Sequence, residues 1–342
     1  CAVPAAMAFC KHMQIVKSDG ATMVSLIEAA LPAQIGKPAH TVVFRHVEAP
    51  PPERGVGKSE VVVTAVSRDV VSRLMGAVKA ARLEPVGIHG EFQAVIRAFD
   101  YLFKRAEDAE HTTLYLDIGA GTTNVVIAHG QRLAFTRTIP LGGVHLDEAI
   151  AKQLKISFEE ASKVRRELIC LTARDAAAAR EEAAARVVAE ASPAVEAVEE
   201  AGAGEAAHAA IEGGEDVAIA APAKVSALEN FGFKPRNPAR APDPDLTEQI
   251  EILSDEIWMC IRYHQSLYPS RKIGRAVFVG GESRNKALCQ HIAKSLRLPS
   301  QVADPMARVA RVGGALMPNV DLSQPQPGWT VPLGLCLCPT DL

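Results

Sequence analysis

The feature that most constrains the fold is an acidic glycine turn set between two apolar runs. TLYLDI (113–118) and NVVIA (124–128) are separated only by GAGTT (119–123), which is too short and too rich in glycine to continue a helix. The two runs are therefore predicted to be strands that fold back on each other. A third strand (132–139) and a helix beginning at Gly142-Gly143 follow. This order predicts an α/β fold.

The turn itself has the composition of a phosphate-binding loop. It comprises Gly119, Ala120, Gly121, Thr122 and Thr123. Glycines allow backbone N–H groups to approach a phosphate closely, and the two threonine hydroxyls can donate to phosphate oxygens. Asp117, at the end of the preceding strand, could hold Mg²⁺ through water, since Mg²⁺ prefers oxygen ligands. The alternative is an ordinary glycine hairpin in which Asp117 only caps the turn.

A second glycine turn follows the predicted strand RAVFVGG (275–281) and precedes a predicted helix (285–296). Gly280 and Gly281 would let a ligand lie against the backbone, with Glu282 beside them, and the helix N-terminus adds partial positive charge. The turn is weak evidence alone. The second turn indicates a binding site only in combination with the first turn.

Residues 172–245 differ in composition from the rest of the chain. They are dominated by Ala and Glu and then by Gly and Pro, and lack a sustained apolar stripe. Such a segment has little to bury, so we predict a flexible insertion that leaves the fold and returns to it. A long helix beginning near residue 246 resumes the fold, with Ile250, Leu253, Ile257 and Ile261 on one face.

Composition excludes several classes of function. The 37 Lys and Arg against 40 Asp and Glu give a net charge of −3, without the basic excess typical of nucleic-acid binding. Seven scattered cysteines indicate a reducing compartment rather than a disulfide framework. No apolar run is long enough to span a bilayer. The chain begins with Cys1, which we interpret as a processed or truncated piece of something longer.

The first hundred residues predict strands at 40–47 and 57–66 and helices at 67–83 and 91–103. Ser18-Asp19-Gly20 is the one candidate for an additional acidic glycine hairpin, but we see no apolar strand before it.

Three passages in this order and spacing resemble PilM-like type IV pilus assembly proteins of the actin-like ATPase superfamily, in its FtsA/PilM branch. They are EVVVTAVSRDVVSRLMGAVKAARLEPVGIHGEFQAVIRAF (60–99), LYLDIGAGTTNVVIAHGQRLAFTRTIPLGG (114–143) and VFVGGESRNKALCQHIAKSLRLPSQVADPMARV (277–309). The resemblance implies a two-lobed, ribonuclease H-like fold with ATP and Mg²⁺ in the cleft. It also implies a cytoplasmic protein, peripheral at the inner membrane, that binds the cytoplasmic tail of a PilN-like bitopic protein and couples it to the pilus or secretion machinery. No membrane span and no nucleic-acid partner are expected.

The resemblance also assigns residues and domains. Residues 119–123 fall on a phosphate loop, Asp117 on its acidic, metal-binding position, Gly142-Gly143 on a glycine pair, and 280–282 on the adenosine loop. The expected parts are a first lobe with an inserted partner-binding subdomain (1–112), a second lobe (113–171 and 246–304), the insertion (172–245), and a C-terminal helix and tail returning to the first lobe (305–342).

Departures from the family pattern weaken the expectation of catalysis. If the chain starts at Cys1, the first phosphate hairpin of the family is missing. Ser162 and Arg165 stand where relatives often carry an acid and a base facing the nucleoside. Arg165 could donate to a nucleotide, although a solvated helix charge is the simpler interpretation. His145 and Asp147 face the cleft only if the helix phase permits.

No second carboxylate is identifiable by spacing, so we assign no catalytic residue and expect weak or absent ATP hydrolysis. Two alternatives remain open. One is a small-molecule kinase or reactivase ATPase on the same fold, and the other is an FtsA-like cell-division protein, which would carry a C-terminal amphipathic membrane helix.

Overall fold

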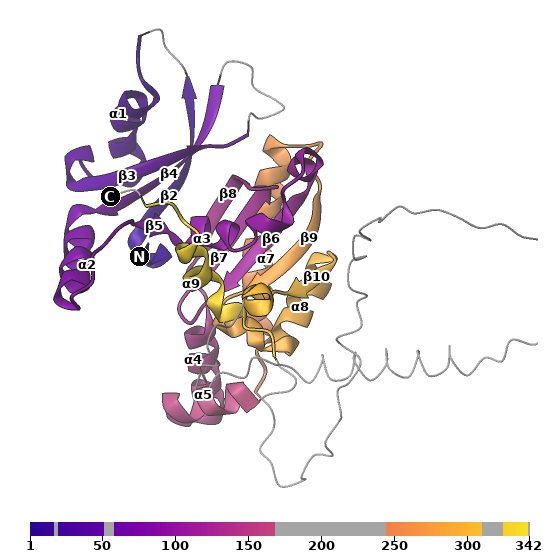
Figure 1. The fold of residues 1–342 in the computed structure, drawn as a ribbon. Helices are drawn as coiled ribbons and strands as arrows, with labels where there is room; N and C mark the ends of the chain where they lie inside the picture. The colour runs from indigo at the N-terminus through magenta and orange to yellow at the C-terminus, as the bar shows by residue number, and fades with distance from the viewer. Residues whose placement is uncertain (17–19, 51–57, 168–243, 310–323, 341–342) are drawn as a thin grey trace, which may run out of the picture. The chain divides into compact units, whose positions relative to one another are not determined.

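The computed structural model describes residues 1–16, 20–50, 58–167, 244–309 and 324–340 (Figure 1). Contacts divide the chain into one unit of Cys1–Asp175 with Pro244–Leu342 and another of Ala176–Asp243. The expected insertion falls almost wholly outside the described residues, and so does most of the helix expected over 305–316.

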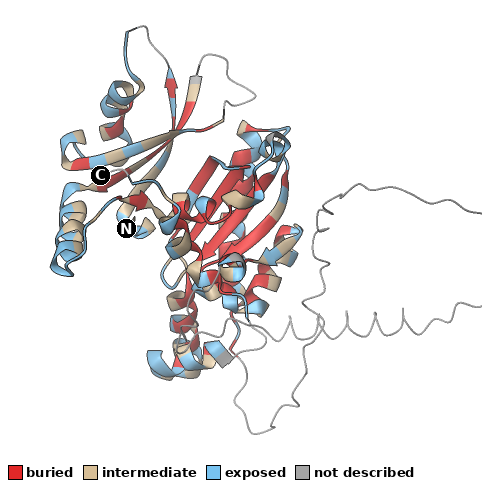
Figure 2. Ribbon diagram, viewed as in Figure 1, coloured by how far each residue is buried: buried red, intermediate tan, exposed pale blue. Residues whose placement is uncertain are grey.

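A five-stranded sheet with the order β10-β9-β6-β7-β8 forms the centre of the first unit. Its strands are β6 (Thr112–Ile118), β7 (Thr123–His129), β8 (Arg132–Ile139), β9 (Ile273–Val279) and β10 (Ser300–Val302). The β6, β7 and β8 strands are antiparallel neighbours, as the turn pattern predicts, whereas β6, β9 and β10 are parallel. Every residue of β6 and β7 is buried (Figure 2), so both faces of the sheet are covered.

Alternate side chains of β6 pack into two separate cores. Leu114, Leu116 and Ile118 join a cluster with helices of the second half of the chain, while Tyr115 joins a cluster with α3. The helices around the sheet are α3 (Glu91–Arg97), α4 (Gly143–Leu154), α5 (Phe158–Glu167), α7 (Thr247–Leu267), α8 (Lys286–Leu296) and α9 (Thr330–Cys336). The predicted apolar face of α7 is confirmed, since Ile250, Leu253, Ile257 and Ile261 are all buried.

A smaller three-stranded antiparallel sheet precedes this core and has the order β2-β4-β3. Its elements are β2 (Ala8–Val16), α1 (Met23–Ile35), β3 (Val42–Glu48), β4 (Lys58–Ser67) and α2 (Arg68–Ala80). Ile27 and Leu31 of α1 are fully buried against one face, where they meet Met13 and Ile15 of β2. The predicted strands and helix of this region are confirmed within a few residues.

The expectation that no strand precedes Ser18-Asp19-Gly20 is wrong, because β2 lies directly before it. In β2 the buried Met13 and Ile15 alternate with exposed Gln14 and Val16, and the exposed Lys11 precedes them on their own face of the strand. Polar residues therefore interrupt the apolar run that would have marked the strand. The strand pairs with β4 and not with β3, the strand that follows it, and Ser18 and Asp19 lie outside the described residues.

Helix α3 ends at Arg97, earlier than the predicted end at residue 103. The carbonyls of Asp100 and Phe103 accept hydrogen bonds from the Gln131 side chain, at 3.0 and 2.8 Å, and Gln131 lies outside any helix.

Short elements complete the fold. They are β1 (Ala2–Val3), which pairs in parallel with β5 (His89–Gly90), and the 3₁₀ turns at Ala5–Met7, Ala39–Thr41, Asp100–Leu102, Ala106–Glu110, Gly281–Arg284, Pro305–Arg308 and Pro327–Trp329. Among the described residues, no helix combines the length and apolar character needed to cross a membrane.

Histidines connect β7, β2 and α7 in the interior. His129 Nε2 lies 2.9 Å from His264 Nε2, and the ring of His12 stacks on Phe135. Burial lowers the pKa of His264 to about 4. Burial, with a smaller repulsion from His264, lowers the pKa of His12 to about 4. Both side chains are therefore neutral in the folded protein at neutral pH.

These depressed pKa values predict an acid-dependent loss of stability. The unfolded histidines titrate near 6.5, so the unfolded state binds more protons between pH 6.5 and 4, and the free energy of unfolding falls across that window as pH decreases. Each histidine contributes at most about 1.4 kcal/mol per pH unit. Urea unfolding at pH 7, 6 and 5 should show a flatter pH dependence for His264→Gln than for the wild type. The exposed His111→Gln is the matched control, and an unchanged slope in the His264 variant would contradict the assignment.

Candidate functional site

Asp117 lies at the carboxyl end of β6 and is nearly buried. Its register partner on β7 is Asn124, whose Nδ2 donates to Asp117 Oδ2 at 3.1 Å. The predicted turn follows at once and is closed by Gly119 N–H donating to the Thr122 carbonyl at 2.9 Å. Ala120 and Gly121 form the exposed tip of this turn. The acid and the open backbone of the turn therefore lie together.

The two threonines of the turn differ in their surroundings. Thr123 is buried, and its hydroxyl donates to the Leu141 carbonyl at 2.7 Å. Thr122 is only half-buried. The hydroxyl of Thr123 thus fixes the turn to the segment before α4, and Thr122 is the threonine of the pair closer to solvent.

The beginning of α4 is docked on the same turn. Gly143 and Val144 donate their N–H groups to the carbonyls of Gly119 and Ala120, at 3.1 and 2.7 Å. A Cβ on Gly142 would lie 2.5 Å from the Gly119 carbonyl oxygen, so only glycine allows this approach. His145 Nδ1 accepts the N–H of Gly142 at 3.1 Å, so this ring nitrogen is engaged by the start of its own helix.

The second predicted turn meets the first because β9 pairs in parallel with β6, with Val279 opposite Asp117. Gly280 has φ of 88°, and a Cβ there would lie 2.4 Å from the Ile118 carbonyl oxygen and 2.6 Å from Asp117 Oδ1. Two segments far apart in sequence therefore converge at Asp117. We call this junction the three-turn site, which consists of residues 117–123, 142–143 and 280–282.

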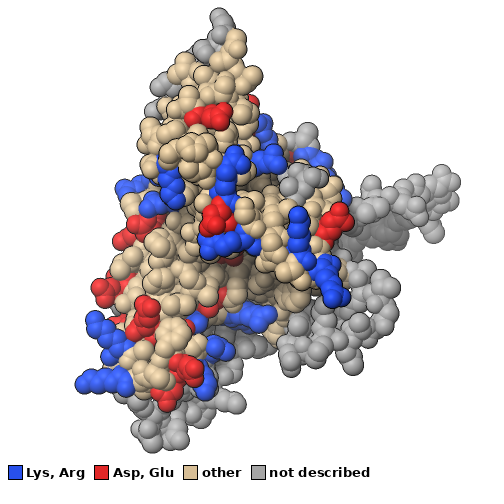
Figure 3. Space-filling model, turned by 90° about the vertical axis from the view of Figure 1, so that its left-hand side faces the viewer, with Lys and Arg blue, Asp and Glu red and all other residues tan. Residues whose placement is uncertain are grey.

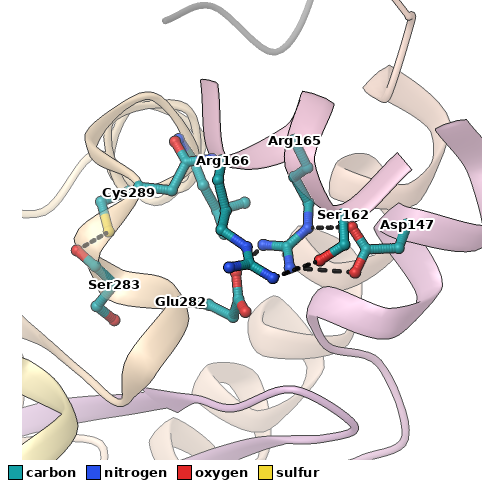
Figure 4. A network of polar contacts seen from close by, with 9 residues as sticks. Asp147, Ser162, Arg165, Arg166, Glu282, Ser283 and Cys289 are labelled. Atoms are coloured by element: carbon teal, nitrogen blue, oxygen red, sulfur yellow. Dashed lines mark hydrogen bonds and ion pairs between the residues drawn. The ribbon is translucent and has the colours of Figure 1, made fainter. Parts of the chain in front are cut away.

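Arg165 bridges the edge of the three-turn site (Figure 4). It donates from Nε and Nη2 to the two carboxylate oxygens of Asp147, at 2.5 and 3.2 Å, and from Nη1 to Glu282 Oε2. All three side chains are at least four-fifths buried, with Arg165 exposed by only 8%. The interpretation of Arg165 as a solvated helix charge is therefore wrong. The neighbouring Arg166 is exposed and contacts Ser162 instead.

Glu91 is a site residue that the sequence analysis missed. Its Oε2 accepts from Asn124 Nδ2 and from the Ala5 N–H, both at 3.1 Å. Asn124 thus joins Glu91 to Asp117, and this places a second carboxylate at the site. Burial raises the pKa of Asp117 to about 6, with Asn124 opposing the shift and the Glu91 charge adding to it. No spacing rule could identify Glu91, because it lies on a separate element 26 residues before Asp117 in the chain.

A groove with a volume of about 140 Å³ lies between the three-stranded sheet and the segment around α3. We call it the α3 groove. It is lined mostly by apolar side chains, with Arg45, Thr64, His89 and Gln93 as its polar members. The remaining lining residues are Val3, Val43, Phe44, Val47, Val62, Val66, Val71, Ile88, Gly90 and Phe92.

The two glycines of the second turn provide a matched test of the junction. Gly280→Ala places a Cβ against β6 at positive φ, so we expect the free energy of unfolding to fall by roughly 2 kcal/mol or more. Gly281→Ala meets nothing within 4 Å and should cost much less. Urea unfolding of both variants measures the difference. Equal costs would show that the turns do not meet as described.

Two family models match the chain. The model described as "Cell division protein FtsA" matches residues 114–325, which is more than half of the chain, and the model described as "Type IV pilus assembly protein PilM" matches residues 1–169. The cell division protein FtsA of Bacillus subtilis (strain 168) is 40% identical over 53 residues, which are 16% of this chain and 12% of that relative.

One solved structure shows the same fold at low sequence identity. A "PilM-PilN type IV pilus biogenesis complex" aligns with a TM-score of 0.63 at 19% identity, covering 98% of this chain and 77% of that one. The ethanolamine utilization protein EutJ of Carboxydothermus hydrogenoformans aligns with a TM-score of 0.40 at 18% identity, covering 92% of this chain and 72% of that one. The amino-terminal match is to PilM and the longer match is to FtsA. The chain therefore belongs to the family whose model is described as "Cell division protein FtsA", and its amino-terminal part is similar to the type IV pilus assembly protein PilM.

Proposed function

We propose that this chain is a nucleotide-responsive adaptor in the cytoplasm. In this proposal it binds ATP at the three-turn site and the cytoplasmic tail of a PilN-like bitopic protein in the α3 groove. That tail holds it at the inner membrane and links it to the pilus or secretion assembly machinery. Acidic and basic side chains are interspersed on the face drawn in Figure 3, in keeping with a protein partner rather than nucleic acid.

Convergence of the glycine turns supports the nucleotide part of the proposal. The exposed backbone at Ala120 and Gly121 and the half-buried Thr122 offer donors to phosphates, while 280–282 would border the nucleoside. Asp117 fits a Mg²⁺ site, because a buried carboxylate with a raised pKa gains most from a nearby cation. When bound, Mg²⁺ would neutralise phosphate charge, and Asp117 would hold it directly or through water.

The composition of the α3 groove supports the proposed binding of the bitopic protein's tail. Most of its lining side chains are apolar, so the groove suits the apolar side chains of a short extended peptide. All of its lining residues precede residue 113, where the sequence predicts the partner-binding region.

The observation that carries the proposal is that neighbouring residues of one short helix serve both places. Glu91, the first residue of α3, contacts Asn124 beside Asp117, while Gly90, Phe92 and Gln93 line the α3 groove. A shift of α3 on nucleotide binding would therefore change the groove directly. Coupling of this kind is reciprocal, so the tail should alter nucleotide affinity by the same factor.

The same assignment gives a proposed domain plan. Residues 1–112 would be the first lobe with its inserted partner-binding subdomain, and 113–171 with 246–304 the second lobe. Residues 305–342 would return to the first lobe, as the packing of α9 on α3 supports. We assign no catalytic residue and no hydrolytic role to this arrangement.

An FtsA-like division protein is the second candidate, because the FtsA model matches the longer part of the chain. Unlike the proposed adaptor, an FtsA-like division protein is expected to carry an amphipathic membrane helix. The last described helix, α9, contains Pro332 and Gly334, has no basic residue in its last turn, and buries Thr330. This helix therefore suits protein packing better than a membrane surface.

Asp117→Asn tests the nucleotide part. The substitution removes the charge but keeps the size and can still contact Asn124, so we expect Mg²⁺ to lose most of its effect on ATP affinity. The expected change is roughly ten-fold or more in the dissociation constant, as for loss of a contact to a charged group. Titration of a fluorescent ATP analogue with and without Mg²⁺ measures it. The exposed Asp69→Asn on α2 is the control, and wild-type Mg²⁺ dependence in the Asp117 variant would refute the assignment.

Val43→Glu tests the partner part. Val43 lines the α3 groove and is 38% exposed, so a charge there should weaken binding of an apolar tail with little cost to folding. The measurement is calorimetric titration with a synthetic cytoplasmic tail of the co-encoded bitopic protein, against a scrambled peptide. Val24→Glu on α1, where Val24 is 49% exposed and outside the groove, is the matched control. Equal affinities of both variants and the wild type would place the tail elsewhere.

A further inference from the structure

A second groove, with a volume of about 600 Å³, shares no lining residue with the three-turn site or the α3 groove. Its walls are residues 8–12 of β2 and 135–138 of β8, and Met259, Cys260 and Tyr263 of α7 line the remaining side. We call it the edge groove. Consecutive residues of both strands line it, so each strand meets the groove with its edge rather than with one face.

Both strands are the end members of their sheets. Within the described strands, β8 pairs only with β7, and β2 pairs only with β4. The Thr136 N–H marks the outer side of β8, because it donates to His12 Nε2 of β2 at 3.2 Å. Backbone groups alternate in direction along an antiparallel strand, so those of Thr138 also point away from β7. An edge of this kind is a template for pairing with another extended segment.

Helix α7 gives the edge groove an apolar floor. Met259 and Tyr263 are 39% and 42% exposed and lie four residues apart, on one face of the helix. The Tyr263 ring packs on that of Phe135 in β8, with the ring centroids 5.4 Å apart. The apolar surface therefore continues from the helix to the strand, and an extended segment could bury its own apolar side chains there.

The charge of the edge groove selects the kind of segment. Among the described residues that line it, two side chains are cationic and none is a carboxylate. Arg137 Nη2 lies 2.7 Å from Oε2 of Glu256, which is outside the lining. Lys11 is exposed and forms no ion pair with any described residue. The charge of Lys11 is therefore available to a carboxylate of a partner, whereas a basic segment would be repelled.

We propose that the edge groove binds an extended acidic segment of a protein partner, which adds to the central sheet as a strand beside β8. Its main chain would pair with the outer edge at Thr138, its alternate apolar side chains would pack on Met259 and Tyr263, and a carboxylate would pair with Lys11. The inference goes beyond the proposed function, because it requires neither nucleotide nor the bitopic tail. It would let the adaptor hold a second protein while the tail occupies the α3 groove.

A model peptide tests the proposed chemistry. The probe is a fluorescently labelled peptide of about eight residues, a common strand length, in which Glu alternates with Val. One counterpart carries Lys in place of Glu, and another is N-methylated at alternate residues, which removes main-chain donors. Fluorescence anisotropy is measured as the full chain is titrated into each peptide. We expect the acidic peptide to bind roughly ten-fold or more tightly than either counterpart.

Two matched pairs of variants locate the binding surface. Lys11→Glu and Met259→Glu should each weaken binding of the acidic peptide, by roughly three- to ten-fold, because each places a negative charge in the groove. Lys79→Glu, on the exposed side of α2, is the control for the first. Ile252→Glu is the control for the second, because Ile252 is 50% exposed on α7 but does not line the groove. Both controls should bind as the wild type does, and thermal melting checks that all variants are folded.

Several results would overturn the proposal. If the wild type binds none of the peptides, or binds the Lys peptide as tightly as the acidic one, the inference fails while the proposed function stands. Undiminished binding of the N-methylated peptide would exclude strand addition. Equal affinities of the groove variants and their controls would place the peptide elsewhere. If the wild type sediments as a dimer that Met259→Glu dissociates, the groove binds a second copy instead.

Titrations with Mg²⁺-ATP and with the bitopic tail separate this inference from the proposed function. Met259→Glu should bind both ligands with wild-type affinity, because the edge groove shares no lining residue with either of their proposed sites. A changed affinity for either ligand would contradict the assignment of the edge groove as a separate surface.

Discussion

The parallel pairing of β6 with β9 is the contact on which the whole site depends. The carboxyl ends of parallel strands meet at one edge of a sheet, so any residues that follow those strands are brought together there. The register sets Val279 opposite Asp117, and the chain then leaves β9 through Gly280 at positive φ, against the backbone of β6. Without this pairing the two glycine turns would be ordinary turns in separate parts of the chain.

Charge at the site follows from the packing of that edge. Burial, with a smaller effect of the Glu91 charge, raises the pKa of Asp117, while the hydrogen bond from Asn124 opposes the shift. On the opposite border, Arg165 neutralises only one of its two carboxylate neighbours. Both borders therefore carry buried negative charge that a bound cation or a neutral donor would stabilise. Helix α3 extends this site to the α3 groove, since it provides residues to both.

Much of the central sheet was predictable, because β6 and β7 are mainly apolar runs separated by a glycine turn. The two glycine turns were predictable as candidates for the same reason. Strand β2 was missed because Lys11, His12 and Gln14 interrupt its apolar alternation, and Glu91 was missed because only the tertiary fold brings it to Asn124. The wrong interpretation of Arg165 has a related cause. Its burial depends on Asp147 and Glu282, of which Glu282 is distant in sequence, and helix periodicity does not show such partners.

Hydrogen–deuterium exchange with and without Mg²⁺-ATP is the most direct test of the central claim, which is that the turns form a single nucleotide site. The account predicts simultaneous protection of backbone amides in peptides covering 117–124, 142–146 and 280–284, with a change in α3. Protection confined to one of these segments, or spread over none of them, would contradict the account.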